Sequence, residues 1–135
     1  MKLDFAFFAN HAEVYSNGLF SVLGGGITLF NLTALPAVCQ SLVLMARVHF
    51  EQEECDAEYT CVAKVISPSG KSLSPDMEID MKTKRQAFPS FVLLYRYNGF
   101  VFIESGIYRF SLFVGERHLG DATLEVTAPM AEENV

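Results

Sequence analysis

The sequence predicts an all-β protein, an antiparallel β-sandwich of the Ig-like, Greek-key kind with about seven to nine strands. Short runs of residues alternate between apolar and polar side chains, which is typical of half-buried strands. Turn-forming residues separate these runs, and no long segment shows the 3.6-residue period of a helix. The clearest alternation lies between Gly99 and Val126, where Tyr108, Phe110 and Leu112 share one parity.

Glycine and proline in the N-terminal third predict where its strands turn and end. Asn17-Gly18 favours the positive φ angles of a two-residue hairpin turn, so residues 13–16 are expected to pair with residues 19–23. The three glycines at 24–26 interrupt a β-prone segment and predict a kinked strand. Pro36 ends that segment, because proline cannot donate to a ladder and restrains the residue before it.

Aromatic or alternating runs mark the other strands. They fall at residues 3–9, 41–51, 57–66, 77–82, 91–97 and 106–127. A glycine-rich break at 115–120 divides the last run, which is therefore expected to form two neighbouring strands.

Length and composition fit one packed domain, expected over residues 1–128, with a flexible acidic tail at 129–135. The net charge of −6 argues against nucleic acid or an anionic membrane surface as partner. No apolar run is long enough to span a membrane. The odd number of cysteines, 3, favours a reducing compartment, and Asp4 does not fit a signal peptide. The expected location is the cytoplasm.

No catalytic, cofactor-binding or metal-binding residues are predicted. His11, His49 and His118 lie far apart and lack the spacing of a zinc site. The carboxylates of residues 51–58 lack the ligand pattern of a calcium loop, so a solvated turn is preferred and cation binding there stays open. The basic residues of 82–85 are expected either in solvent or against the acidic loop of a neighbouring chain.

Apolar side chains also occupy the strand faces that should point outward. The clearest examples are Val43, Met45, Val92, Leu94 and Phe113. Either the N-terminal segment and loops cover these residues, or they form a contact surface for a second subunit. We therefore expect a non-enzymatic interaction module that forms a homo-oligomer. A small β-protein that binds an apolar ligand is the alternative, and a metal-dependent enzyme is the third hypothesis.

Tyr108 is predicted to have a structural role, because it lies near the start of a strand after Gly106. In Greek-key sandwiches such a tyrosine sends its hydroxyl back to upstream backbone, here near Glu104. Phe110, of the same parity, is expected in the core.

Several short motifs follow one another along the chain. The first segment follows L-x-x-A-x-x-A-[DN]-x-A from Leu3 to Ala12, and Asn17-Gly18-Leu19 and the glycines after Leu23 come next. A central Ser-Pro-Ser-Gly turn and the run GIYRFSLFVG from Gly106 to Gly115 complete the series. In this order the motifs resemble a family of bacterial and phage-borne proteins known only as a domain of unknown function. The resemblance implies a β-sandwich and no functional residues.

Overall fold

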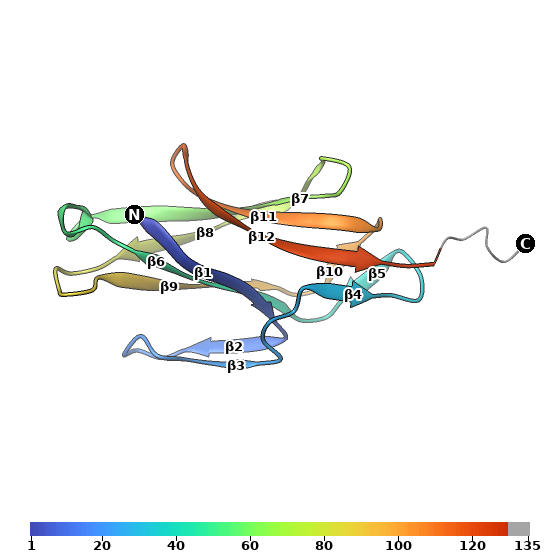
Figure 1. Ribbon diagram of the computed structural model, residues 1–135, viewed down its shortest axis with the longest axis horizontal. Coiled ribbons are helices and arrows are strands. Elements are labelled where there is room, and N and C mark those ends of the chain that lie inside the picture. Colours follow the sequence, from blue (N-terminus) through green and yellow to red (C-terminus); the bar gives the residue numbers. More distant parts are fainter. Residues whose placement is uncertain (130–135) are drawn as a thin grey trace, which may run out of the picture.

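The computed structural model describes residues 1–129, whose regular secondary structure is almost entirely β-strand (Figure 1). The strands are β1 (Lys2–Ala9), β2 (His11–Val14), β3 (Phe20–Leu23), β4 (Leu29–Asn31), β5 (Ala37–Cys39), β6 (Leu42–His49), β7 (Glu58–Ile66), β8 (Ser72–Lys82), β9 (Ser90–Tyr97), β10 (Phe100–Phe102), β11 (Gly106–Val114) and β12 (Arg117–Thr127). A three-residue 3-10 helix, η1 (Gln52–Glu54), precedes β7. Within this range no helix is both long and apolar enough to cross a membrane. Of the expected tail, residues 130–135 lie outside the described residues.

The all-β class is confirmed, with more strands than the seven to nine expected. The excess comes partly from β4, β5 and β10, which have 3 residues each. Three residues are too few to show an alternating pattern, so the sequence marks these strands poorly. β8 is also longer than expected, because it begins at Ser72 and continues through Pro75.

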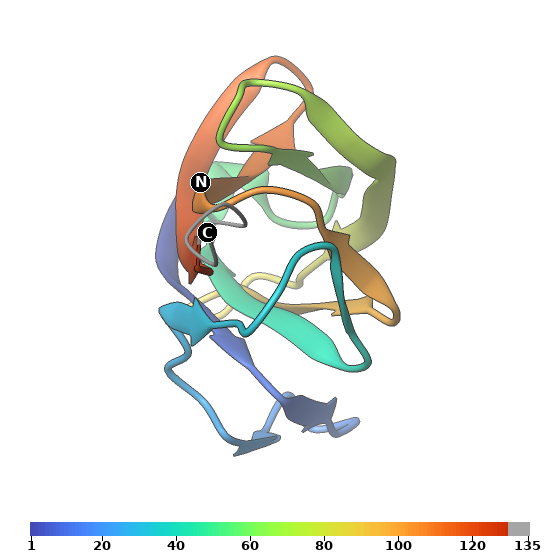
Figure 2. The ribbon, with the colours of Figure 1, turned by 90° about the vertical axis from the view of Figure 1, so that its right-hand side faces the viewer.

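The strands form four sheets, and none of them closes into a barrel. The order is β4-β12-β11-β7-β8 in the largest sheet and β1-β6-β9 in the second. The remaining pairs are β2-β3 and β10-β5. Figure 2 looks along the strands and shows the larger sheet curving above the second one, with the β2–β3 hairpin outside them.

One pairing departs from the antiparallel arrangement that the sequence predicted. β4 runs parallel to β12, with Leu29 opposite Glu125 and Asn31 opposite Thr127. The other strand pairs of residues 1–129 are antiparallel. Alternation along a strand shows which face is buried but not the direction of its neighbour, so the sequence pattern carried no sign of this pair.

The main hydrophobic cluster contains side chains from both large sheets. β11 contributes Tyr108, Phe110 and Leu112, all with 0% exposure, as their shared parity predicted. The Phe110 ring meets Phe8 of β1 edge to face at a centroid distance of 4.7 Å and Tyr97 of β9 at 5.2 Å. Burying one such ring contributes roughly 1.5–3 kcal/mol, so Phe110 links the two sheets through its contacts with β1 and β9.

Two turns position the β2–β3 hairpin and the strand β10 against the rest of the fold. A hairpin forms around Asn17-Gly18 as predicted, but its turn is not the two-residue turn expected. β2 pairs with β3 from Val14 opposite Phe20 to His11 opposite Leu23, and the Tyr15 N–H donates to the Leu19 carbonyl over 2.8 Å, so residues 16–18 form the turn. After β9, the turn at Asn98-Gly99 takes the chain out of the three-stranded sheet, because β10 pairs with β5 and not with β9. Gly99 has a φ of 74° in this turn.

Candidate functional site

The β2–β3 hairpin packs on part of the apolar outer face predicted from the sequence. Val43 and Met45, on β6, retain 3% and 0% exposure and form a second cluster with Ala9 and Ala12. Val92 and Leu94 on β9 are only half-buried at its margin. Of these four interface candidates, Val43 and Met45 are therefore buried under the hairpin, whereas Val92 and Leu94 stay partly accessible at the edge of the sheet.

Phe113, the fifth candidate, lies on the other large sheet. Its ring stacks on the His118 ring at 4.9 Å, and the Lys64 ammonium lies 5.3 Å from its centroid. Phe113, Val92 and Leu94 were all expected on outward strand faces, but Phe113 lies on a different sheet and does not join the other two. Sheet membership, which alternation does not report, decides which outward residues become neighbours.

Tyr108 makes the backbone contact expected of it. Its hydroxyl donates to the Glu104 carbonyl over 2.8 Å, and the Glu104 N–H donates to the same hydroxyl over 3.2 Å. Gly106 between them has a φ of 129°, and a Cβ atom there would lie 2.7 Å from the Pro68 side chain. This turn therefore favours glycine for both conformation and space.

β9 lies at one edge of the three-stranded sheet, with β6 on its other side. The Phe50 N–H donates to the Pro89 carbonyl over 2.8 Å, which sets the phase of the β6–β9 ladder. Because antiparallel residues direct their backbone groups alternately to either side, those of Leu93 and Tyr95 face β6. The groups that face away belong to Ser90, Val92, Leu94 and Arg96. Among residues 1–129 they have no backbone partner.

The edge of β8 differs from the edge of β9 in how it is protected. β8 contains Pro75 and the charged residues Asp76, Glu78 and Asp80, which are features that discourage pairing with another chain. β9 has eight residues, no proline and one charge, Arg96. A long apolar edge of this kind is a template for an added strand.

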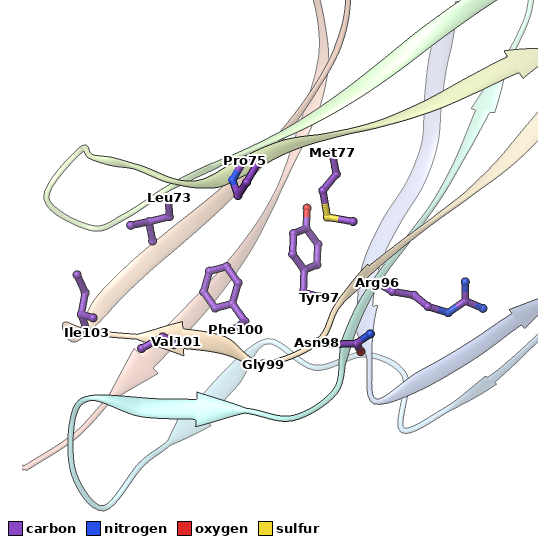
Figure 3. A pocket seen from close by; sticks show the side chains of 10 residues that line it. All are labelled: Leu73, Pro75, Met77, Arg96, Tyr97, Asn98, Gly99, Phe100, Val101 and Ile103. Carbon is purple, nitrogen blue, oxygen red and sulfur yellow. The ribbon is translucent and has the colours of Figure 1, made fainter.

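A groove of about 480 Å³ lies between β8 and the β9–β10 segment (Figure 3). Its β8 wall is formed by Leu73, Pro75 and Met77, and Phe100 and Val101 line the other side. This volume is within the range of about 300–1,000 Å³ that is common for ligand sites. The sequence patterns did not indicate the groove, because its walls come from strands separated by a turn and a loop.

Tyr97 lies in the wall of the groove with a hydroxyl that has no hydrogen-bond partner in the described structure. The residue is 5% exposed. Figure 3 shows its ring rising from β9 toward β8, with the oxygen directed to Pro75 and Met77. Burial, together with the nearby Asp76 carboxylate, raises the pKa of Tyr97, so the phenol stays protonated. In contrast, the buried Tyr95 hydroxyl donates to the Cys61 carbonyl over 2.7 Å.

Exposed apolar side chains continue from the groove onto the β5–β10 pair. Val38 and Val101 are directly opposite each other and are 56% and 44% exposed. Ile103, after β10, is 50% exposed and also lines the groove. The sequence analysis did not identify this surface; the apolar residues of both parities at 100–103 are the signal that could have marked it.

A cluster of polar side chains surrounds Asp121 on β12. Its carboxylate accepts a hydrogen bond from Ser111 over 2.6 Å, contacts a His118 ring nitrogen at 2.6 Å, and lies 3.6 Å from Arg109. Burial opposes ionisation, but these hydrogen bonds and nearby positive charges lower the pKa of Asp121 overall. The carboxylate stands between serine and histidine, whereas a hydrolase triad places histidine between serine and aspartate.

The acidic and basic loops meet within one chain. Arg85 lies 3.5 Å from Asp56, and Glu54 lies 3.6 Å from Arg117. In residues 1–129, no three His, Cys, Asp or Glu side chains are close enough together to hold a metal ion. Contact with a neighbouring chain is not needed to partner Arg85.

The three cysteines are free, and their exposure differs. Cys61 and Cys55 are buried at 0% and 6% exposure, whereas Cys39 is half-buried. Burial raises the pKa of both the Cys61 and the Cys39 thiols. A protonated, buried thiol is a poor nucleophile, so Cys61 behaves as a small core residue.

Comparison with curated proteins gives no match. A family model does match, and it covers residues 4–127, from within β1 to the end of β12. That range includes the β9 edge, the groove and the Tyr108 turn. The resemblance stated from the sequence is thereby confirmed: the chain belongs to a family of unknown function, DUF6941.

Proposed function

We propose that this protein is a non-enzymatic contact module that associates with a second copy of itself through β9. The observation that carries this proposal is the outward-facing backbone of Ser90, Val92, Leu94 and Arg96, which has no partner among residues 1–129. Satisfying buried or edge backbone groups by strand addition gives affinity without catalytic residues.

The sequence of β9 is compatible with pairing to itself. In an antiparallel arrangement with a two-fold axis at Leu93, Val92 stands opposite Leu94 of the second copy, and Ser90 stands opposite Arg96. These pairs leave no like charges facing each other, and each residue meets one of the same face. About eight backbone hydrogen bonds form across such an edge, because each outward residue contributes one donor and one acceptor.

The outer-face side chains extend the contact beyond the backbone. Val92 and Leu94 are half-buried beside the cluster that contains Val43 and Met45. Pairing of two β9 strands places Val92 and Leu94 from both copies in one apolar ladder. This arrangement gives the sequence-predicted interface residues on β9 a direct role, while Val43 and Met45 support the sheet from beneath the hairpin.

Size-exclusion chromatography with light scattering tests the proposal between micromolar and millimolar protein. We expect a mass approaching twice the 15.0 kDa of one chain as concentration rises. Val92→Pro removes an outward N–H without removing a bond to β6, so it should shift the equilibrium to monomer. Val92→Thr keeps that N–H and is the matched control. Circular dichroism verifies that both variants fold, and a wild-type protein that stays monomeric throughout contradicts the proposal.

We also propose that the two large sheets form a Greek-key, Ig-like sandwich and that the module works in the cytoplasm. The shared hydrophobic cluster and the hydrogen bond from Tyr108 to Glu104 support the architecture. Three free thiols support a reducing setting.

A further inference from the structure

The groove between β8 and β10 combines apolar walls with one unused polar group. Leu73, Val101 and Ile103 supply aliphatic surface along it, and the latter two are about half exposed. Tyr97 supplies a hydroxyl that finds no partner in the described protein. Buried hydroxyl groups are normally paired, so an unpaired one in the wall of a groove indicates a position for an external partner.

The Tyr97 ring is held firmly enough to present its hydroxyl at one place. It packs edge to face on Phe100 at 5.9 Å and on Phe110 at 5.2 Å. Met77 lines the same groove, on the side toward which the Tyr97 hydroxyl points in Figure 3, and its unbranched thioether chain adapts its shape at low cost. Because the hydroxyl is buried, a ligand reaches it only if a neighbouring side chain moves, and we infer that Met77 is that side chain.

The charges near the hydroxyl select the kind of ligand. Asp76 directly follows Pro75 on the β8 wall toward which the Tyr97 hydroxyl points in Figure 3, so its negative charge disfavours a second one there. Arg96 is at the rim, but Figure 3 shows its guanidinium directed away from the hydroxyl. A neutral acceptor or hydroxyl on the ligand is consequently favoured over a carboxylate at this position.

We propose that this groove binds a neutral amphiphile whose alkyl chain lies along Leu73, Val101 and Ile103 and whose hydroxyl or carbonyl group meets Tyr97. The groove adjoins the β9 edge, because Arg96 and Tyr97 of β9 also line it, whereas the proposed alkyl chain contacts residues on β8 and in the β10 segment. Binding leaves the protein backbone unchanged and requires movement of Met77.

Isothermal titration calorimetry of the full chain with 1-octanol tests the site, and octanoate serves as the charged analogue. We expect saturable binding of 1-octanol and weaker binding of octanoate. Tyr97→Phe should weaken 1-octanol binding roughly fivefold to tenfold through the lost hydrogen bond. Tyr95→Phe is the matched control, because Tyr95 is buried two residues away but does not line the groove; its affinity should stay at the wild-type value.

A second variant keeps the test independent of the core. Val101→Ser should also lower the affinity for 1-octanol. Because the Val101 side chain is exposed, the thermal midpoint of unfolding should stay near that of the wild type. Methyl NMR should report shifts at Met77 and Ile103 on titration. Absence of saturable binding, equal affinity of octanoate, or wild-type affinity in Tyr97→Phe overturns the proposal.

Discussion

Replacing each of the three buried tyrosines by phenylalanine should lower the free energy of unfolding by different amounts, because their hydroxyl groups differ in their hydrogen-bond partners. In Tyr108→Phe, the Glu104 carbonyl loses a donor at 2.8 Å and the Glu104 N–H loses an acceptor at 3.2 Å. Each net hydrogen bond contributes about 0.5–1.5 kcal/mol, and Glu104 is only half-buried, so water recovers part of the loss. The free energy of unfolding should fall by about 1–2 kcal/mol.

Urea unfolding followed by circular dichroism measures this difference, with all variants under identical conditions. Tyr95→Phe should cost about 1–3 kcal/mol, because the Cys61 carbonyl that it abandons is buried. Tyr97→Phe removes a hydroxyl without a partner and should leave stability unchanged or raise it. Equal losses in Tyr108→Phe and Tyr97→Phe would show that ring packing, and not hydrogen bonding, sets the cost of each substitution.

Three further predictions use other parts of the molecule. Phe110→Ala should lower the free energy of unfolding by about 3–5 kcal/mol in the same urea titration, because it leaves a cavity where the two sheets meet. A smaller loss than that of Tyr108→Phe would mean that the Phe110 ring is not part of the core. Asp121 has a lowered pKa when folded, so its stabilisation is present above the unfolded value of about 3.9 and is lost as pH falls through the folded pKa. Asp121→Asn should therefore flatten the fall in stability on acidification, and an unchanged pH profile would contradict the role of its Ser111 and His118 contacts. In native protein, a thiol reagent should modify Cys39 before Cys61, as peptide mass spectrometry would show; earlier labelling of Cys61 would mean that the main cluster opens readily.

The positions of the longer strands, and which alternate residues of each strand are buried, could be predicted because both follow from the local alternation of apolar and polar residues. Tyr108, Phe110 and Leu112 are inward, as expected, and a hairpin forms around Asn17-Gly18, with a turn one residue longer than predicted. The short β10 was missed because three residues of mixed parity give no period. Strand direction was also beyond the pattern, so the parallel β4–β12 pair could not be seen.

The candidate surface was predicted only in part, for reasons of long-range packing. Alternation identified Val43 and Val92 as outward residues, but only the fold shows that the hairpin buries Val43 and leaves β9 at an edge. Tyr95 and Tyr97 have the same parity and equal sequence signals. One finds a carbonyl across the core and the other finds none, a difference that depends on strands far away in sequence.

Hydrogen exchange of individual amides, followed by NMR at low and high protein concentration, tests the pairing of β9 most directly. The amides of Leu93 and Tyr95 face β6 and should be protected at both concentrations. If β9 pairs with a second copy, the amides of Val92 and Leu94 exchange quickly in dilute protein and become protected as the concentration rises. Rapid exchange of Val92 and Leu94 at every concentration would show that the β9 edge stays unpaired and would contradict self-association through it.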